Sequence, residues 1–129
     1  MGRILAVDPG DARIGLAVSD PTGLLARPLL VLEHSSREED ARRIAQEADS
    51  LEASAIIIGL PLDQEGKVGP QARKSLRLAE ALREKTDLPV RTWDESGTTM
   101  QALESHGQDE LLDARAAAFL LQDYLDAQT

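Results

Sequence analysis

The fold is decided by residues 4–18, which read ILAVDPGDARIGLAV. Two apolar runs, Ile4–Val7 and Ile14–Val18, have the length of short buried strands. Between them stands Asp8-Pro9-Gly10-Asp11, whose residue types favour a turn. This spacing predicts two neighbouring strands that run in opposite directions.

A third strand is expected at Arg27–Leu32, after a second turn signal at Asp20-Pro21-Thr22-Gly23. Pro28 cannot donate a hydrogen bond to a strand ladder, which favours an edge position or a late start for this strand. The beginning of the chain therefore predicts an antiparallel meander.

Helices and strands alternate after the meander. Ser36-Arg37-Glu38-Glu39 has the Ser-x-x-Glu form of a capping box, and apolar residues follow it at helical spacing. Ala55–Ile58 is a continuous apolar run, as expected of a central strand covered on both faces. The remaining expected elements are a helix opened by Pro70 with an apolar stripe of Ala72, Leu76, Ala79 and Leu82, a strand at Val90–Trp93, a short helix at Thr98–Ser105 and a closing helix at Leu111–Leu125.

This order predicts the α/β class, with a mixed five-stranded sheet, an antiparallel meander followed by parallel strands, and helices on both faces. The length of 129 residues suits one domain, residues 1–129. No stretch approaches the roughly 20 apolar residues that span a bilayer, so we expect a cytoplasmic protein without a membrane partner.

The residue types available to bind a metal are restricted. The chain has no cysteine, which excludes disulfides and thiolate-bound zinc. His34 and His106 are too few for a typical zinc site, and we interpret them as ordinary surface or loop residues. Any bound metal should therefore have oxygen ligands.

The net charge of −9 argues at first against a nucleic-acid partner, because phosphate neutralisation supplies much of the affinity in such complexes. The basic residues are nevertheless concentrated between Gly66 and Arg91, at Lys67, Arg73, Lys74, Arg77, Arg83, Lys85 and Arg91. This local basic surface is compatible with nucleic-acid binding, although a solvated helix face would have the same composition.

Acidic residues stand where apolar segments meet polar sequence, at Asp8, at Asp94-Glu95 and at Asp113. Carboxylates in such positions are suited to holding divalent cations beside a phosphodiester. Each has a structural alternative: Asp8 could initiate a turn, Asp94-Glu95 could favour a helix start, and Asp113 could pair with Arg13 or Arg115. Helical spacing directs Asp113 toward the sheet, on the same stripe as Ala116, Ala117, Leu120, Leu121 and Tyr124.

Four blocks stand out along the chain: Val7–Gly10 with Arg13–Asp20, Ile58–Pro61 running to Gly66, Asp94-Glu95 with Thr98-Thr99, and Asp113–Ala117 with Leu120-Leu121. In this order and spacing they resemble the YqgF (RuvX) family, relatives of the RuvC Holliday-junction resolvases within the ribonuclease H-like fold. The resemblance covers nearly the whole chain. Two basic residues usual in the family are absent, because Ala12-Arg13 replaces Lys-Arg and Ser96-Gly97 replaces Arg-Leu.

The resemblance implies a ribonuclease H-like, metal-dependent nuclease that hydrolyses phosphodiester bonds with two Mg²⁺ or Mn²⁺ ions. Asp8, Glu95 and Asp113 stand at the positions of the family's acidic triad and are expected to be catalytic metal ligands, with Asp94 as an accessory ligand. The candidates for contacting the nucleic-acid backbone are Arg13, Lys67, Arg73, Lys74, Thr98 and Thr99.

The resemblance leaves two substrates open. The family is linked to processing of the 5′ end of pre-16S rRNA, which is our leading expectation, and to cleavage of branched DNA such as Holliday junctions. Nothing in the sequence separates ribose from deoxyribose. A homodimer would suit a junction, because two active sites match two strands, although no residue pattern encodes an interface.

Two other classes of protein remain open. Actin-like ATPases also begin with a strand that ends in Asp-x-Gly, but they need two such domains to enclose ATP, and this chain has the length of one. A non-catalytic binding module of the transcription or ribosome-assembly machinery would keep the fold without needing the carboxylates.

Overall fold

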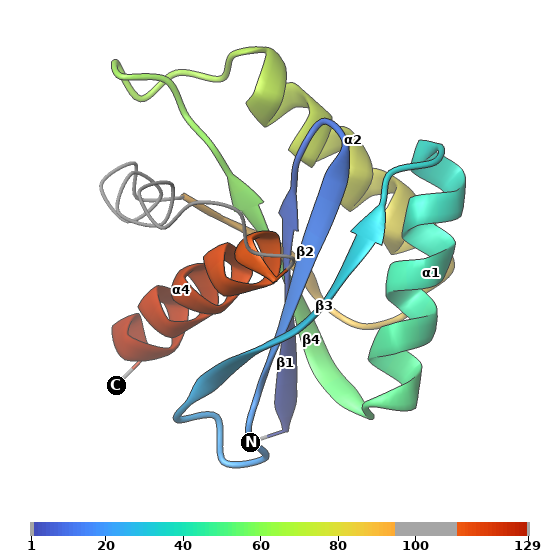
Figure 1. The fold of residues 1–129 in the computed structure, drawn as a ribbon, viewed down its shortest axis with the longest axis vertical. Helices are drawn as coiled ribbons and strands as arrows, with labels where there is room; N and C mark the ends of the chain where they lie inside the picture. The colour runs from blue at the N-terminus through green and yellow to red at the C-terminus, as the bar shows by residue number, and fades with distance from the viewer. Residues whose placement is uncertain (1, 95–110, 129) are drawn as a thin grey trace.

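The computed structural model describes residues 2–94 and 111–128. At its centre is a five-stranded sheet in the order β3-β2-β1-β4-β5 (Figure 1). Its strands are β1 (Arg3–Pro9), β2 (Arg13–Ser19), β3 (Ala26–Glu33), β4 (Ala53–Leu60) and β5 (Val90–Asp94). The first three strands pair antiparallel, whereas β4 pairs parallel with both β1 and β5. The predicted meander followed by parallel strands is confirmed.

Helices cover both faces of the sheet, as the sequence predicted (Figure 1). The helices α1 (Arg37–Ser50) and α2 (Pro70–Lys85) pack on one face, and α4 (Leu112–Ala127) packs on the other. The helix expected at Thr98–Ser105 lies outside the described residues. None of the helices in the described ranges is long and apolar enough to cross a membrane.

The two faces of the sheet have separate apolar cores because strand side chains alternate with a period of two. In β1, Leu5 and Val7 belong to the core under α1 and α2. Ile4 and Ala6 belong to the core under α4, together with Leu121 of that helix. The next side chain in the second series is that of Asp8, which therefore lies on the α4 face.

The α1 helix begins as the sequence predicts. The Ser36 hydroxyl accepts a hydrogen bond from the backbone N–H of Glu39 at 3.1 Å, which is the N-cap bond of the expected capping box. The Glu39 carboxylate in turn accepts a hydrogen bond from Nε of Arg42 at 3.0 Å.

The apolar stripe predicted for α2 was partly wrong. Ala72, Ala79 and Leu82 are buried, but Leu76 is 36% exposed. The helix is rotated so that Leu78 packs in the core instead. A helix with leucines on more than one side can bury only one face, and the packing partners on α1 and the sheet decide which face it is.

The edge position predicted for the strand that contains Pro28 is confirmed, because β3 is the first strand of the sheet. The pairing of β2 with β3 shifts register between Leu16 and Ala17, where Leu16 faces Leu30 and Ala17 faces Pro28. The irregularity falls where proline removes a backbone donor from the ladder.

The contact between α4 and β2 is unusually close at one glycine. A Cβ atom on Gly15 would lie 1.9 Å from the carbonyl oxygen of Asp113, in the first turn of α4. The buried alanines Ala114 and Ala117 help this approach because their side chains are short. The helix can therefore reach this depth only over a residue that has no side chain.

The loop between β3 and α1 is held by a buried acid, Asp40, which is 2% exposed. Its carboxylate accepts hydrogen bonds from the Ser35 backbone N–H at 3.0 Å and from Arg43 at 2.8 Å, and it contacts Nδ1 of His34. The backbone N–H of His34 donates to the Ala12 carbonyl at 2.9 Å. This network ties the start of α1 to the β1–β2 turn.

We predict that Gly15→Ala lowers the free energy of unfolding by about 3 kcal/mol, the upper end of the usual cost of overpacking. The reason is that the new methyl group meets backbone atoms of Asp113, which cannot rotate away. Urea denaturation measures the change. Gly69→Ala is the control, because its Cβ would meet nothing within 4 Å, and it should stay within about 1 kcal/mol of the parent chain. Equal effects of the two substitutions would contradict the close contact.

We also predict that Asp40→Ala destabilises the chain by about 3 kcal/mol, because it removes the buried carboxylate that accepts hydrogen bonds from the Ser35 backbone and from Arg43. Asp49→Ala on the exposed side of the same helix should change stability by less than about 0.5 kcal/mol. Thermal unfolding followed by circular dichroism compares the two variants. An Asp40→Ala chain as stable as the parent would show that this network does not hold the loop.

Candidate functional site

The predicted site begins at Asp8, near the carboxyl end of β1. The residue is buried, with 9% of its surface exposed, and its side chain lies on the α4 face of the sheet. Gly15 on β2 pairs with it directly. On the other side, the parallel register that pairs Val7 with Ile58 brings Gly59 of β4 next to it. The carboxylate therefore has a glycine beside it on each neighbouring strand.

Asp113 is brought to the same end of the sheet by the close packing of α4. Its backbone lies against Gly15, the residue that pairs with Asp8. Its side chain is 34% exposed, so it lies at the rim of the interface rather than deep inside it. Two acids from opposite ends of the chain thus reach one place on the α4 face.

Arg13 is the ion-pair partner of Asp113, one of the two partners considered from the sequence. Its Nε donates to Oδ2 of Asp113 at 2.8 Å, and its side chain is 61% exposed. This hydrogen bond, and then the charge of the carboxylate, raise the pKa of Arg13 above its ordinary value. The Arg13 guanidinium therefore already binds one carboxylate oxygen of Asp113, a predicted metal ligand.

Asp94 ends β5, where it pairs with Leu60 and is exposed. The preceding residue, Trp93, packs edge-to-face on Tyr124 of α4, with ring centroids 5.2 Å apart. Alternation along the strand then directs Asp94 to the opposite face from Asp8. The other predicted residues of this region, Glu95, Thr98 and Thr99, lie outside the described residues.

The oxygen donors that the structure brings together fit a hard divalent cation. Asp8 and Asp113 supply carboxylates, the ligands that Mg²⁺ and Mn²⁺ favour. Within residues 2–94 and 111–128, no group of three His, Asp or Glu side chains lies close enough to hold a metal ion. The third carboxylate of the predicted set, Glu95, falls in the gap between these ranges.

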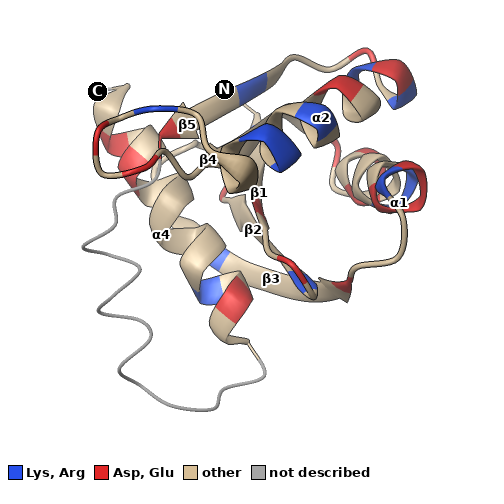
Figure 2. Cartoon of the chain, turned by 90° about the horizontal axis from the view of Figure 1, so that it is seen from above, with Lys and Arg blue, Asp and Glu red and all other residues tan. Residues whose placement is uncertain are grey.

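The basic residues predicted to contact nucleic acid are distributed over several surfaces, and those on α2 are visible in Figure 2. Arg13 lies at Asp113, on the α4 face. Lys74 of α2 pairs with Asp11 at 2.7 Å, on the face covered by α1 and α2. Lys67, in the loop before α2, pairs with Glu65 at 3.3 Å, and Arg73 is exposed in the first turn of α2.

Two features of this end of the sheet were missed from the sequence. The first is the contact of Asp11 with two residues of α2, Lys74 and Gln71. Hydrogen bonds from Lys74 and then from Gln71 lower the pKa of the Asp11 carboxyl. The second is the pairing of His34 with buried Asp40, since His34 was interpreted as an ordinary loop residue. A signal for the second was available, because Asp40 precedes buried Ile44 by four residues and so shares its helix face.

Comparisons with known proteins extend over nearly the whole chain. A family model described as "RuvX: Holliday junction resolvase" matches residues 2–127. The "Putative pre-16S rRNA nuclease" of Thermoanaerobacter pseudethanolicus is 38% identical over 135 residues, which cover 98% of this chain and 97% of that protein. The protein of the same name from Desulforamulus reducens is 40% identical over 133 residues, with 97% of each chain covered.

Solved structures show the same fold. T. thermophilus RuvC, in complex with a Holliday junction substrate, matches with a TM-score of 0.61 and 17% identity, covering 99% of this chain and 96% of that one. The fowlpox virus Holliday junction resolvase matches with a TM-score of 0.59 and 14% identity, covering 97% and 99%. The expected ribonuclease H-like fold is confirmed. Since the family model spans residues 2–127 and the curated relatives align over nearly their whole length, the chain belongs to the RuvX family.

Proposed function

We propose that this chain is a divalent-metal-dependent nuclease that processes the 5′ end of pre-16S rRNA. The observation that carries the proposal is the convergence of Asp8 and Asp113 on one end of the sheet, through the contact of α4 with Gly15. The names of the relatives from Thermoanaerobacter and Desulforamulus support the choice of substrate. A cytoplasmic location and a single domain over residues 1–129 belong to the same proposal.

Asp8, Glu95 and Asp113 would hold two Mg²⁺ or Mn²⁺ ions. Asp94, at the end of β5 on the opposite face of the sheet, would have its accessory role only indirectly, by orienting a ligand or a bound water. Such ions lower the pKa of bound water and stabilise the charge on the phosphate oxygens during hydrolysis. The role of Asp8 is to present a carboxylate whose position is set by a central strand. Its two glycine neighbours keep the strands beside it free of side chains.

Arg13 has two roles in this proposal. In the chain alone it orients Asp113 and balances its charge through the 2.8 Å hydrogen bond. Its large exposed surface lets the same guanidinium bind a phosphate oxygen of the substrate, since arginine donors match phosphate geometry. Further contacts with the nucleic-acid backbone are proposed for Lys67, Arg73, Lys74, Thr98 and Thr99.

Cleavage of Holliday junctions is the second candidate function. It is favoured by the description of the family model that matches residues 2–127. A homodimer would then place one active site on each of two strands.

We predict that Asp8→Asn and Asp113→Asn each lower kcat for cleavage by more than about a hundredfold, beyond the 10–100-fold loss typical of a residue that only supports a metal ligand. Asp123→Asn, on the exposed side of α4, is the matched control and should cleave like the parent chain. Chelation of divalent ions should abolish cleavage, and added Mg²⁺ or Mn²⁺ should restore it. Full activity of Asp8→Asn would refute the proposed site.

The substrate is tested by giving the purified chain a pre-16S rRNA leader, a four-way DNA junction and a linear duplex under the same conditions. We expect the rRNA leader to be cut with the highest kcat/KM, and Asp8→Asn to remove that cleavage. Preferential cutting of the junction would establish the second candidate. Full function in cells of a chain with Asp8, Glu95 and Asp113 all replaced would favour a non-catalytic binding module.

Arg13→Gln is predicted to tighten Mn²⁺ binding severalfold, because it removes the cation that pairs with Asp113. Isothermal titration calorimetry measures the affinity of the parent and variant chains. Arg27→Gln serves as the control for the loss of one positive charge, because Arg27 lies at the opposite end of the sheet, where it pairs with Val18. Weaker Mn²⁺ binding by Arg13→Gln would show that Arg13 does not compete for this carboxylate.

A further inference from the structure

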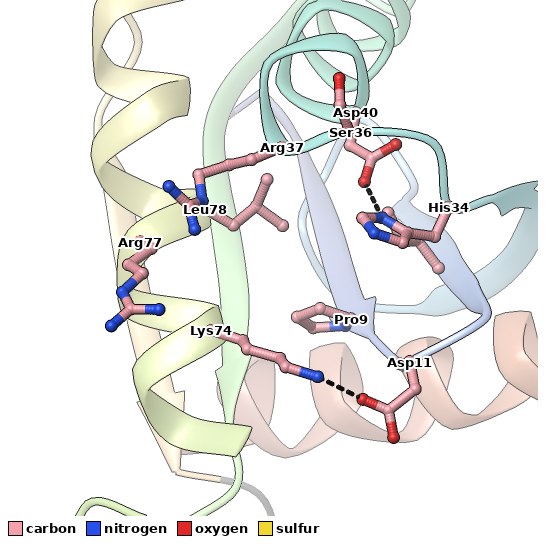
Figure 3. A pocket seen from close by; sticks show the side chains of 11 residues that line it. Pro9, Asp11, His34, Ser36, Arg37, Asp40, Lys74, Arg77 and Leu78 are labelled. Carbon is pink, nitrogen blue, oxygen red and sulfur yellow. Dashed lines mark hydrogen bonds and ion pairs between the residues drawn. The ribbon is translucent and has the colours of Figure 1, made fainter. Parts of the chain in front are cut away.

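A second feature of this end of the sheet is a pocket of about 260 Å³ on the face covered by α1 and α2. It lies between the β1–β2 turn, the start of α1 and the side of α2 (Figure 3). Its floor includes Pro9, Ile14 and Leu78, and Ile14 and Leu78 are buried. The charged residues of the lining are Asp11, Arg37, Asp40, Lys74 and Arg77.

The charges around the pocket do not cancel. Lys74 is paired with Asp11 at 2.7 Å, and Asp40 is paired with His34 and Arg43. Two cations of the lining remain, Arg37 from the first turn of α1 and Arg77 from α2. Within the described parts of the chain, neither guanidinium has an ion-pair partner.

Both residues line the same hollow although they come from different helices: the Arg37 side chain extends from α1 toward α2, and Arg77 lies on α2 itself (Figure 3). An anion bound at this rim would be attracted by both cations. Arginine binds phosphate oxygens through paired N–H donors, and the apolar floor strengthens such contacts by displacing water. These two arginines are therefore suited to binding a phosphate group.

The position of the pocket indicates where the phosphate comes from. Pro9, in its lining, directly follows Asp8, and alternation along β1 sends these two side chains to opposite faces. The pocket and the acidic site are therefore separated only by the end of β1 and the turn that follows it. A polyanionic strand that passes over this turn would present phosphates to both sites.

We propose that this pocket, through Arg37 and Arg77, binds a backbone phosphate of the nucleic-acid strand whose scissile phosphate lies at Asp8 and Asp113. The inference rests on the proposed nuclease function and adds a second anchoring point on the opposite face of the sheet. A free phosphorylated small molecule has the same recognition chemistry, and the experiment separates the two sources.

The test measures binding with cleavage suppressed. In an Asp8→Asn chain, fluorescence anisotropy gives the affinity for a labelled pre-16S rRNA leader and a labelled four-way junction over a range of salt concentrations. Arg37→Gln and Arg77→Gln are expected to weaken binding by about three- to tenfold each and to lower the slope of log K against log salt by about 1. Arg27→Gln removes the same charge from the far end of the sheet and should leave both quantities unchanged.

All three arginines are exposed, so these substitutions should leave the fold intact, and thermal unfolding checks that they do. Equal effects of Arg27→Gln and the pocket variants would overturn the proposal, because binding would then depend on total charge. The proposal is also overturned if inorganic phosphate or a nucleoside monophosphate binds the pocket in calorimetric titrations while the pocket variants keep the parent affinity for nucleic acid.

Cleavage assays on chains that retain Asp8 distinguish a failure of the pocket proposal from a failure of the proposed nuclease function. The Arg37→Gln and Arg77→Gln chains should show a raised KM and an unchanged kcat, since neither residue lies on the face of the acidic site. Loss of kcat in these variants would contradict a purely anchoring role. Absence of cleavage by the parent chain itself would instead refute the nuclease function, and it would leave the binding measurements to decide the pocket on their own.

Discussion

The structure depends on the direct contact between α4 and β2 at Gly15. Because glycine has no side chain, the first turn of α4 can rest its backbone on the strand, where any other residue would place a Cβ 1.9 Å from the Asp113 carbonyl oxygen. This contact determines the depth and the end at which the last helix meets the sheet. It also determines where Asp113 lies relative to Asp8, which pairs with the same glycine. One position thus links the packing of the C-terminal helix to the geometry of the acidic site.

The alternation of side chains at the end of β1 organises the function of this edge of the sheet. Asp8 faces α4 and Pro9 faces α1 and α2, so consecutive residues serve two different environments. On the α4 face, the carboxylates of Asp8 and Asp113 lie near the first turn of α4. On the other, arginines from two helices surround an apolar hollow. The acidic pair and the two arginines therefore lie on the two faces of a single turn, which suits a ligand that carries many phosphates and the cations bound to them.

Much of this arrangement could be predicted from the sequence, because the signals were local. The turn after Val7, the cap at Ser36 and the continuous run Ala55–Ile58 each define an element within a few residues, and the order of the elements then predicts the sheet. Helical spacing also predicted that Asp113 points toward the sheet, whereas its side chain lies at the rim of the interface, paired with Arg13. The rotation of α2, which exposes Leu76, could not be predicted, because it depends on which neighbours the helix meets. The same holds for Asp11 with Lys74 and for the gathering of Arg37 with Arg77, since these residues come together only across the tertiary structure.

The edge strand β3 has a consequence for how copies of this chain can associate. An open strand edge is a template for extending a sheet into a neighbouring molecule. Here the register shift between β2 and β3 beside Pro28 breaks the regular spacing of backbone groups along that strand, and such irregularities blunt an edge. Recruitment of another backbone along β3 is therefore disfavoured, which guards against uncontrolled self-association. Two copies that came together would have to meet through side chains on their helices or loops rather than by joining their sheets through β3.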